Sequence, residues 1–276
     1  MKVSQFLYKS FPEHSKTFDQ IEVHLAALEM SKLSQVHPKV NKTTLPRTVF
    51  LFLVYNQIVL HRVIDLSQSI LQAWECKNVP TAFVLLRTLY ENTSVVFDAN
   101  LRLKDLIRQK DFDGIYKLIF NLQYGTRVKE RIEGAVTSEM KSGKTENQLN
   151  VSEKDLEEVY TAQQILNVMD RISKVFPDHR MMYESMCEYS HPNFDALMGL
   201  YGNWKDEFII EISASNAISE KNVSKFFWAF AFSLEIFVLA YDAILGKFND
   251  IIDLSNDELI RQGRDTTAYG KAFDDT

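Results

Sequence analysis

The sequence predicts an all-α protein, a single multi-helix bundle of about seven or eight helices with two long apolar central helices. Apolar residues recur at helical spacing over most of the chain. Glycine and proline, which punctuate sheets and loops, number only 9 and 6 among 276 residues. The one stretch with β character is 204–212, which we expect to be an extended segment or a small hairpin.

Proline marks the boundaries of the first three predicted helices. The first spans 17–36 and ends before Pro38, because a residue that precedes proline avoids the helical region. The second spans 46–74 with proline in its first turn, where the missing N–H is tolerated. The third begins at Pro80 and runs to about 103, with Asn78 as its cap.

The remaining elements have weaker signals. The polar stretch 134–151 is predicted to be an exposed loop, and the tail 264–276 to be flexible. The other predicted helices are 104–132 (with a break at Asp113-Gly114), 152–176, 179–191, 193–201, 222–248 and 255–263. The long apolar helices 46–74 and 222–248 would lie inside the bundle. We therefore expect one helical domain over 1–276, with its core at about 17–248.

Composition narrows the classes of function. The formal net charge of −6 argues against a general nucleic-acid binder, because phosphate binding depends on many Lys and Arg side chains. The two cysteines, Cys76 and Cys187, form no Cys-x-x-Cys pair and suit a reducing compartment. The N-terminal segment lacks the apolar core of a signal peptide. The expected location is the cytoplasm.

The segment 226–241 is apolar except for Ser233 and Glu235. A membrane span needs ~20 predominantly apolar residues, so we interpret this segment as a buried helix and expect no membrane insertion. It belongs either to the core of the bundle or to a surface that packs on a second copy of the chain. A homodimer is therefore one expectation for its partners.

Arg87 and Glu91 are the first candidate site residues. Their spacing of four places them on one face of a helix that is otherwise rich in leucine. If they are buried, they must be paired or hydrogen-bonded, because an isolated buried charge is strongly unfavourable. The alternative is an intrahelical ion pair on a solvated face.

Glu235 is the second candidate, because a carboxylate in the middle of an apolar helix needs a partner from another helix. Arg87 is the partner that we predict. The alternative is that this face of the helix contacts water.

The predicted helix 179–191 places Tyr183, Cys187 and His191 on one face. His191 stands at the C-terminal end, where the helix dipole favours the imidazolium form, and a histidine there is suited to general acid or base catalysis. A capping role is the alternative for His191. The neighbours of Cys187 favour a buried structural thiol over a nucleophile.

No cofactor and no metal are predicted. The stretch Ser142-Gly143-Lys144-Thr145 is similar to the end of a phosphate-binding loop, but Ser138 occupies the position of the first glycine and no strand precedes it. The pair Glu188-x-x-His191 has the spacing of a helical metal-ligand pair, but the second such pair of a di-iron bundle is missing. A mononuclear site stays open as an alternative.

Two motifs together resemble a bacterial helical family of unknown function: Arg87-x-x-x-Glu91 with its leucines, and the later Tyr183…Ser190-His191-Pro192. The resemblance covers roughly 46–245. That family is in turn similar to the HEPN proteins, many of which are ribonucleases in toxin and anti-phage systems. The HEPN hallmark is an arginine followed by a histidine after four to six residues, and this sequence lacks that spacing.

Two hypotheses of function follow. The resemblance implies a metal-independent ribonuclease, in which His191 acts as acid or base, Arg87 stabilises the phosphorane charge and Glu91 orients Arg87. The acidic charge favours a non-catalytic module that binds a small molecule or a partner protein. In that module Arg87, Glu91, Glu235 and His191, with Tyr183 close by, hold the helices in register.

Overall fold

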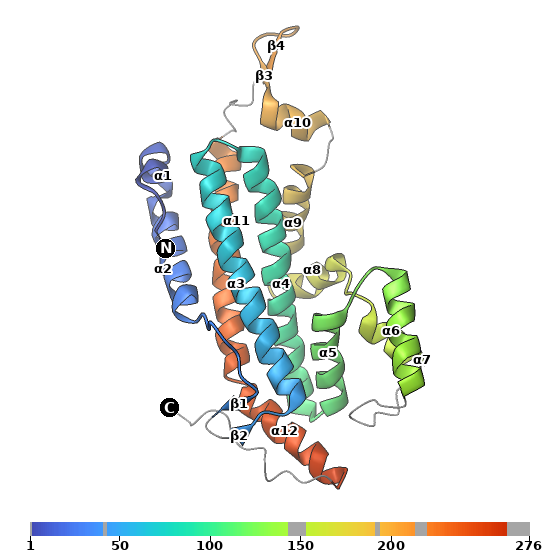
Figure 1. The fold of residues 1–276 in the computed structure, drawn as a ribbon. Helices are drawn as coiled ribbons and strands as arrows, with labels where there is room; N and C mark the ends of the chain where they lie inside the picture. Colours follow the sequence, from blue (N-terminus) through green and yellow to red (C-terminus); the bar gives the residue numbers. More distant parts are fainter. Residues whose placement is uncertain (1, 41–42, 143–152, 191–193, 213–219, 264–276) are drawn as a thin grey trace. The chain divides into compact units, whose positions relative to one another are not determined.

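The computed structural model describes residues 2–40, 43–142, 153–190, 194–212 and 220–263 (Figure 1). The all-α prediction is confirmed, because helices make up most of the described chain and the strands form only two small two-stranded sheets. The helices are α1 Gln5–Ser10, a 3₁₀ turn at Pro12–His14, α2 Ser15–Met30, α3 Arg47–Glu75, α4 Val79–Gln109, α5 Phe112–Tyr124, α6 Lys129–Ser142, α7 Glu153–Tyr160, α8 Ile165–Ser173, α9 His179–Glu188, α10 Phe194–Tyr201, α11 Glu220–Leu245 and α12 Phe248–Arg261. The strands are β1 Lys39–Val40, β2 Thr43–Thr44, β3 Gly202–Trp204 and β4 Ile210–Ile212.

The chain divides into two compact units. Unit 1 comprises residues 1–32, 59–98 and 168–241, and unit 2 comprises residues 33–58, 99–167 and 242–276. The three longest helices, α3, α4 and α11, each contribute residues to both units. Neither unit is therefore a continuous stretch of the sequence.

Aromatic side chains form the centre of unit 1. Phe227 of α11 packs edge-on against Phe18 of α2, with ring centroids 4.8 Å apart, and its neighbour Phe226 packs edge-on against Trp74 of α3 at 5.0 Å. Edge-to-face pairs of this kind add to the free energy gained by burying the rings. The apolar composition of 222–248 thus reflects a helix that packs on several neighbours.

Unit 2 has its own apolar centre. Phe52 of α3 and Phe248 of α12 are both fully buried, with ring centroids 5.6 Å apart. A smaller cluster of Val136, Leu156 and Tyr160 joins α6 to α7. The amphipathic character of these short helices is what lets them cover one another.

The expected break near Asp113-Gly114 is present, but it lies a few residues earlier. Helix α4 continues to Gln109, and α5 begins at Phe112. Asp111 caps α5 by accepting a 2.9 Å hydrogen bond from the backbone N–H of Gly114. A Cβ atom at Gly114 would lie 2.5 Å from the Asp111 carboxylate, so any other residue there would force this capping side chain to shift.

The helix predicted over 152–176 is two helices, α7 and α8, and the prediction of one helix is wrong. Tertiary hydrogen bonds stabilise the break. The Asn121 amide donates to the carbonyl oxygen of Thr161 at 2.7 Å, and Thr126 forms a parallel β-bridge with Thr161. These partners lie about 35–40 residues away along the chain, so no local sequence signal announces them.

Two other boundaries are corrected. Residues 134–142 of the predicted loop belong to α6, and 143–152 lie outside the described residues, as does the tail 264–276. The last helix begins at Phe248 instead of Ser255, whose hydroxyl is buried and donates to the carbonyl of Ile251 within the helix. Of the two alternatives for 204–212, an extended segment or a small hairpin, the structure has the hairpin, formed by β3 and β4.

Two helical stretches, 48–75 and 222–245, are long and apolar enough to cross a membrane by length and composition. Their most apolar windows have mean hydropathies of 1.5 and 1.7, and 50% and 56% of these windows is buried inside the protein. The core helix of a water-soluble protein has the same composition, so this is weak evidence for a span.

Candidate functional site

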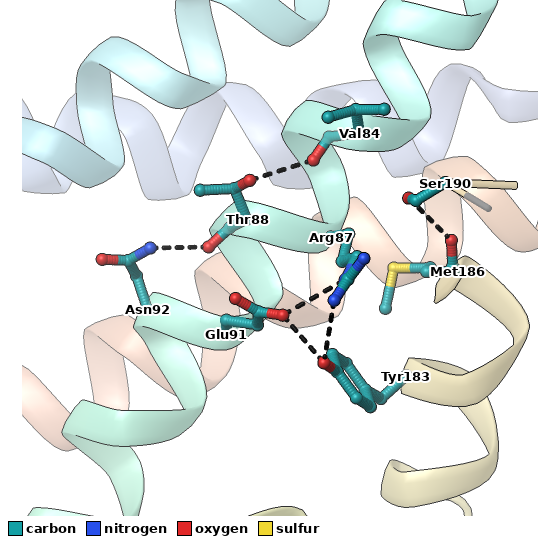
Figure 2. Close-up of polar contacts among 8 residues, drawn as sticks. All are labelled: Val84, Arg87, Thr88, Glu91, Asn92, Tyr183, Met186 and Ser190. Atoms are coloured by element: carbon teal, nitrogen blue, oxygen red, sulfur yellow. Dashed lines mark hydrogen bonds and ion pairs between the residues drawn. The ribbon is translucent and has the colours of Figure 1, made fainter. Parts of the chain in front are cut away.

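The cluster Arg87–Glu91–Tyr183 joins α4 to α9 within unit 1 (Figure 2). The Nε atom of Arg87 donates to Glu91 Oε1 at 3.2 Å, and the Tyr183 hydroxyl donates to the same oxygen at 2.8 Å. Arg87 Nη2 donates to the Tyr183 hydroxyl at 3.4 Å, and its guanidinium carbon lies 5.7 Å from the centroid of the tyrosine ring. Each member therefore contacts the other two.

The local sequence of α4 explains how the cluster is presented. Asn78 caps the helix by accepting a bond from the Thr81 N–H, as predicted. Thr88 donates to the carbonyl of Val84, and Asn92 donates to the carbonyl of Thr88 (Figure 2). Thr88 and Asn92 thus donate their hydrogen bonds to the preceding turn of their own helix, and not to Arg87 or Glu91.

The cluster lies at the edge of the core. The side chains of Arg87 and Glu91 are 30% and 32% exposed, whereas Tyr183 is buried. The pair is thus partly buried, and both alternatives for it apply in part: Arg87 and Glu91 form an intrahelical ion pair, and they also have a hydrogen-bond partner on another helix. A guanidinium with this exposure can still meet an anion from solvent.

The electrostatic environment keeps the neighbouring acids protonated. Burial, reinforced by the hydrogen bond to Glu91, raises the pKa of Tyr183 well above its ordinary value. Burial also raises the pKa of the half-buried Cys187 thiol, and the opposing effects of Tyr183 and Arg87 do not cancel this. Neither group is a ready nucleophile at neutral pH, which agrees with the expectation of a structural thiol.

A second polar contact between α4 and α9 was not predicted. His179 is buried, and its Nδ1 and Nε2 atoms lie 2.8 Å from the Tyr90 hydroxyl and 2.9 Å from the Ser94 hydroxyl. The rings of His179 and Tyr90 also stack, with centroids 4.6 Å apart. Burial lowers the pKa of His179 to about 4, so the imidazole is neutral at pH 7.

A third contact joins α4 to α8. The Nε and Nη2 atoms of Arg171 donate to the two carboxylate oxygens of Asp98 at 2.6 and 2.7 Å. The Asp98 side chain is 2% exposed and that of Arg171 is 36% exposed. This bidentate geometry is the strongest form of an arginine–carboxylate pair.

The sequence carried a signal for these missed residues. Tyr90, Ser94 and Asp98 are spaced by four, so they form one polar row along a helix face that is otherwise apolar. All three are buried, and all three meet partners from α8 or α9. A polar row at this spacing on an apolar helix predicts contact with another polar element.

The prediction that Glu235 is buried beside Arg87 is wrong. Glu235 is exposed on α11, and its electrostatic interaction is with His24 of α2. The alternative, that this face of the helix contacts water, describes the structure. The flanking residues Leu234 and Ile236 are buried, so the carboxylate occupies the narrow solvent-facing stripe of a helix that is apolar on its other sides.

His191 lies outside the described residues, so its position relative to Arg87 stays a prediction. Helix α9 ends at Glu188, which is exposed, and the hydroxyl of Ser190 donates to the carbonyl of Met186 (Figure 2). Among the residues that the structure describes, no group of three or more His, Cys, Asp or Glu is placed to hold a metal ion.

Comparison with known proteins adds a family assignment. Residues 58–208 match a family described as a family of unknown function (DUF5677). The matched range contains the Arg87 cluster and the His179 and Asp98 contacts, and it stops short of Glu235. No curated protein and no solved structure matches the chain.

Proposed function

We propose that this chain, which belongs to the DUF5677 family, is a non-catalytic helical binding module for a partner protein or a small molecule. One observation carries the proposal: the polar groups between α4 and the helices α8 and α9 bond chiefly to one another. Mutually satisfied networks of this kind hold helices in one register. The module would present a surface that such networks keep rigid.

The chemistry of the described groups supports this proposal over catalysis. A general base must be deprotonated and positioned near its substrate at the working pH. His179 is neutral, but it is buried and both of its ring nitrogens have hydroxyl partners. Tyr183 and Cys187 have raised pKa values and stay protonated at neutral pH.

A HEPN-like ribonuclease, acting in a bacterial toxin or anti-phage system, is the second candidate. The observation that favours it is the exposure of Arg87, whose side chain is 30% accessible and carries the charge that a phosphate would meet. This candidate requires His191 to act with Arg87 as acid or base. RNA would then be the partner.

A fluorescent RNA cleavage assay separates the two candidates. We expect no cleavage by the parent protein, and a lower melting temperature for Arg87→Ala, because the cluster is structural. Arg180→Ala is the matched control, since Arg180 lies on α9 and forms exposed ion pairs with Asp170 and Glu184. Cleavage by the parent that is lost in both Arg87→Ala and His191→Ala, at unchanged melting temperature, would overturn the proposal and establish the ribonuclease.

The proposed location of the protein is the cytoplasm, without membrane insertion. A second copy of the chain is one proposed partner. The buried half of each long apolar helix supports this, because those residues already have protein neighbours. After cell lysis without detergent, we expect the full chain to stay in the supernatant on ultracentrifugation. Recovery only in the detergent-extracted membrane fraction would contradict the proposal. Light scattering of the purified chain then gives its oligomeric state.

A further inference from the structure

A cleft with both apolar and charged lining lies within unit 2, whereas the Arg87 cluster belongs to unit 1. Its volume is about 510 Å³, which falls within the range of roughly 300–1,000 Å³ that is typical of small-molecule sites. The walls come from α4, α5, the end of α7 and the segment that follows α7. Its charged and amide side chains belong to Arg102, Lys117, Asn121, Glu157, Glu158 and Gln163.

The cleft carries charges of both signs from different helices. Arg102 of α4 and Lys117 of α5 are both half-buried, and they supply the positive charge. Glu157 and Glu158, in the last turn of α7, supply exposed carboxylates.

The wall formed by the end of α7 is held in place by tertiary hydrogen bonds. The Asn121 amide nitrogen donates to the carbonyls of Val159 at 2.9 Å and Thr161 at 2.7 Å. The N–H of Thr126 donates to Tyr160, and the N–H of Ala162 donates back to Thr126. These bonds fix the Asn121 side chain by its nitrogen, so its Oδ1 atom is the end that can accept a bond from a ligand.

We infer that this cleft binds a small zwitterion with the chemistry of a free amino acid or a short peptide. The ligand carboxylate would meet Arg102 and Lys117, since a guanidinium is suited to bidentate recognition of carboxylates. The ligand ammonium would meet Glu157 and Glu158. The two carboxylates would repel a simple anion, and the two basic groups would repel a simple cation. Only a ligand that carries both charges suits both walls of the cleft.

Calorimetric titration of the full chain with an alanine series tests the inference. The probes are L-alanine, dialanine and trialanine, together with N-acetyl-L-alanine, which lacks the ammonium, and L-alaninamide, which lacks the carboxylate. We expect at least one uncapped probe to bind, and the two capped probes to bind at least about tenfold more weakly. The tightest uncapped probe tells an amino-acid site from a peptide site.

Variants assign the binding to this cleft. Lys117→Gln and Glu158→Gln should each weaken binding of the best probe by about tenfold. Lys129→Gln and Glu130→Gln are the matched controls, because both residues are exposed and lie in unit 2 outside the cleft lining. These controls should bind like the parent.

Three outcomes would overturn the inference. They are no heat of binding for any probe up to about 10 mM, equal binding of capped and uncapped probes, and equal loss in the cleft variants and the controls. Circular dichroism of each variant checks that it is folded before titration. The result is independent of the Arg87 cluster, whose variants are assayed separately.

Discussion

Two side chains of α9, those of Tyr183 and His179, are shielded from water and form hydrogen bonds with side chains of α4. Tyr183 is 3% exposed and His179 is 2% exposed, so each must find its polar partners inside the protein. Both find them on α4. A buried polar group that loses its partner is destabilising, and the two residues therefore give measurable predictions.

Replacing Tyr183 by phenylalanine should lower the free energy of unfolding by about 1 kcal/mol. The change removes the 2.8 Å bond to Glu91 and the 3.4 Å bond from Arg87, while the ring stays in place. The loss is modest, because Arg87 and Glu91 are partly exposed and regain water. Urea denaturation measures it. Tyr124→Phe, at an exposed tyrosine, should change the free energy far less, and an equal loss in both variants would refute the assignment.

The pH dependence of stability should report His179. Burial holds its pKa at about 4 in the folded protein, below the ordinary value of 6.5 that it has in an unfolded chain. Between these values the unfolded state binds more protons, so the free energy of unfolding falls as the pH drops from about 6.5 to 4. The folded state loses roughly 3 kcal/mol at most over this window.

Urea denaturation between pH 4 and 7.5 tests this slope. His179→Gln should be less stable than the parent at pH 7, because the ring that stacks on Tyr90 is gone, and its stability should change less with pH. His37→Gln is the control, since His37 is exposed, and it should keep the slope of the parent. A slope that survives in His179→Gln would rule out the histidine as its source.

Among the elements, α4 is the helix that organises unit 1. It contacts α9 through Glu91 and Tyr90, and α8 through Asp98. A row of polar groups on an apolar helix restricts its neighbours to the positions in which those groups are paired. The short helices α8 and α9, with 9 and 10 residues, would be marginal in isolation and depend on these contacts.

Arg171→Ala should destabilise the protein by roughly 3 kcal/mol, because it leaves the buried carboxylate of Asp98 without its bidentate partner. Arg180→Ala, which breaks only exposed ion pairs, should have little effect. Thermal denaturation of the two variants side by side gives the comparison. If the two variants unfold at the same temperature, the ion pair of Arg171 with Asp98 does not hold α8 to α4.

For the whole molecule, the prediction of a single domain over 1–276 stays a prediction, and the chain divides into two compact units. Each unit is assembled from three separate stretches of sequence. The helices α3, α4 and α11 each carry residues of both units without interruption. An α-helix forms cooperatively along its length, so unfolding of one unit disturbs helices that the other needs.

Scanning calorimetry should accordingly show one unfolding transition for the full chain, with equal calorimetric and van't Hoff enthalpies. Two separated transitions, or a calorimetric enthalpy well above the van't Hoff value, would show that the units unfold independently. Repeating the scan on Arg171→Ala provides the control: the transition should move to lower temperature as a whole, although the substitution lies in unit 1.

The sequence by itself determined the helical class, the two long apolar helices, the start of α4 at its asparagine cap and proline, and the β character of 204–212. These follow from composition, periodicity and capping, which act within a few residues. The sequence also indicated that Arg87 and Glu91, as charges among leucines, need partners, and it placed Tyr183 nearby on a second helix.

Only the tertiary structure decided which residues meet. Asn121 bonds the segment that separates α7 from α8, His179 pairs with Tyr90, and Asp98 pairs with Arg171 across long separations in sequence. Glu235 shows the converse, because a carboxylate among apolar neighbours on one helix faces solvent once that helix has packed. Periodicity tells which residues share a helix face, whereas packing alone determines what that face contacts.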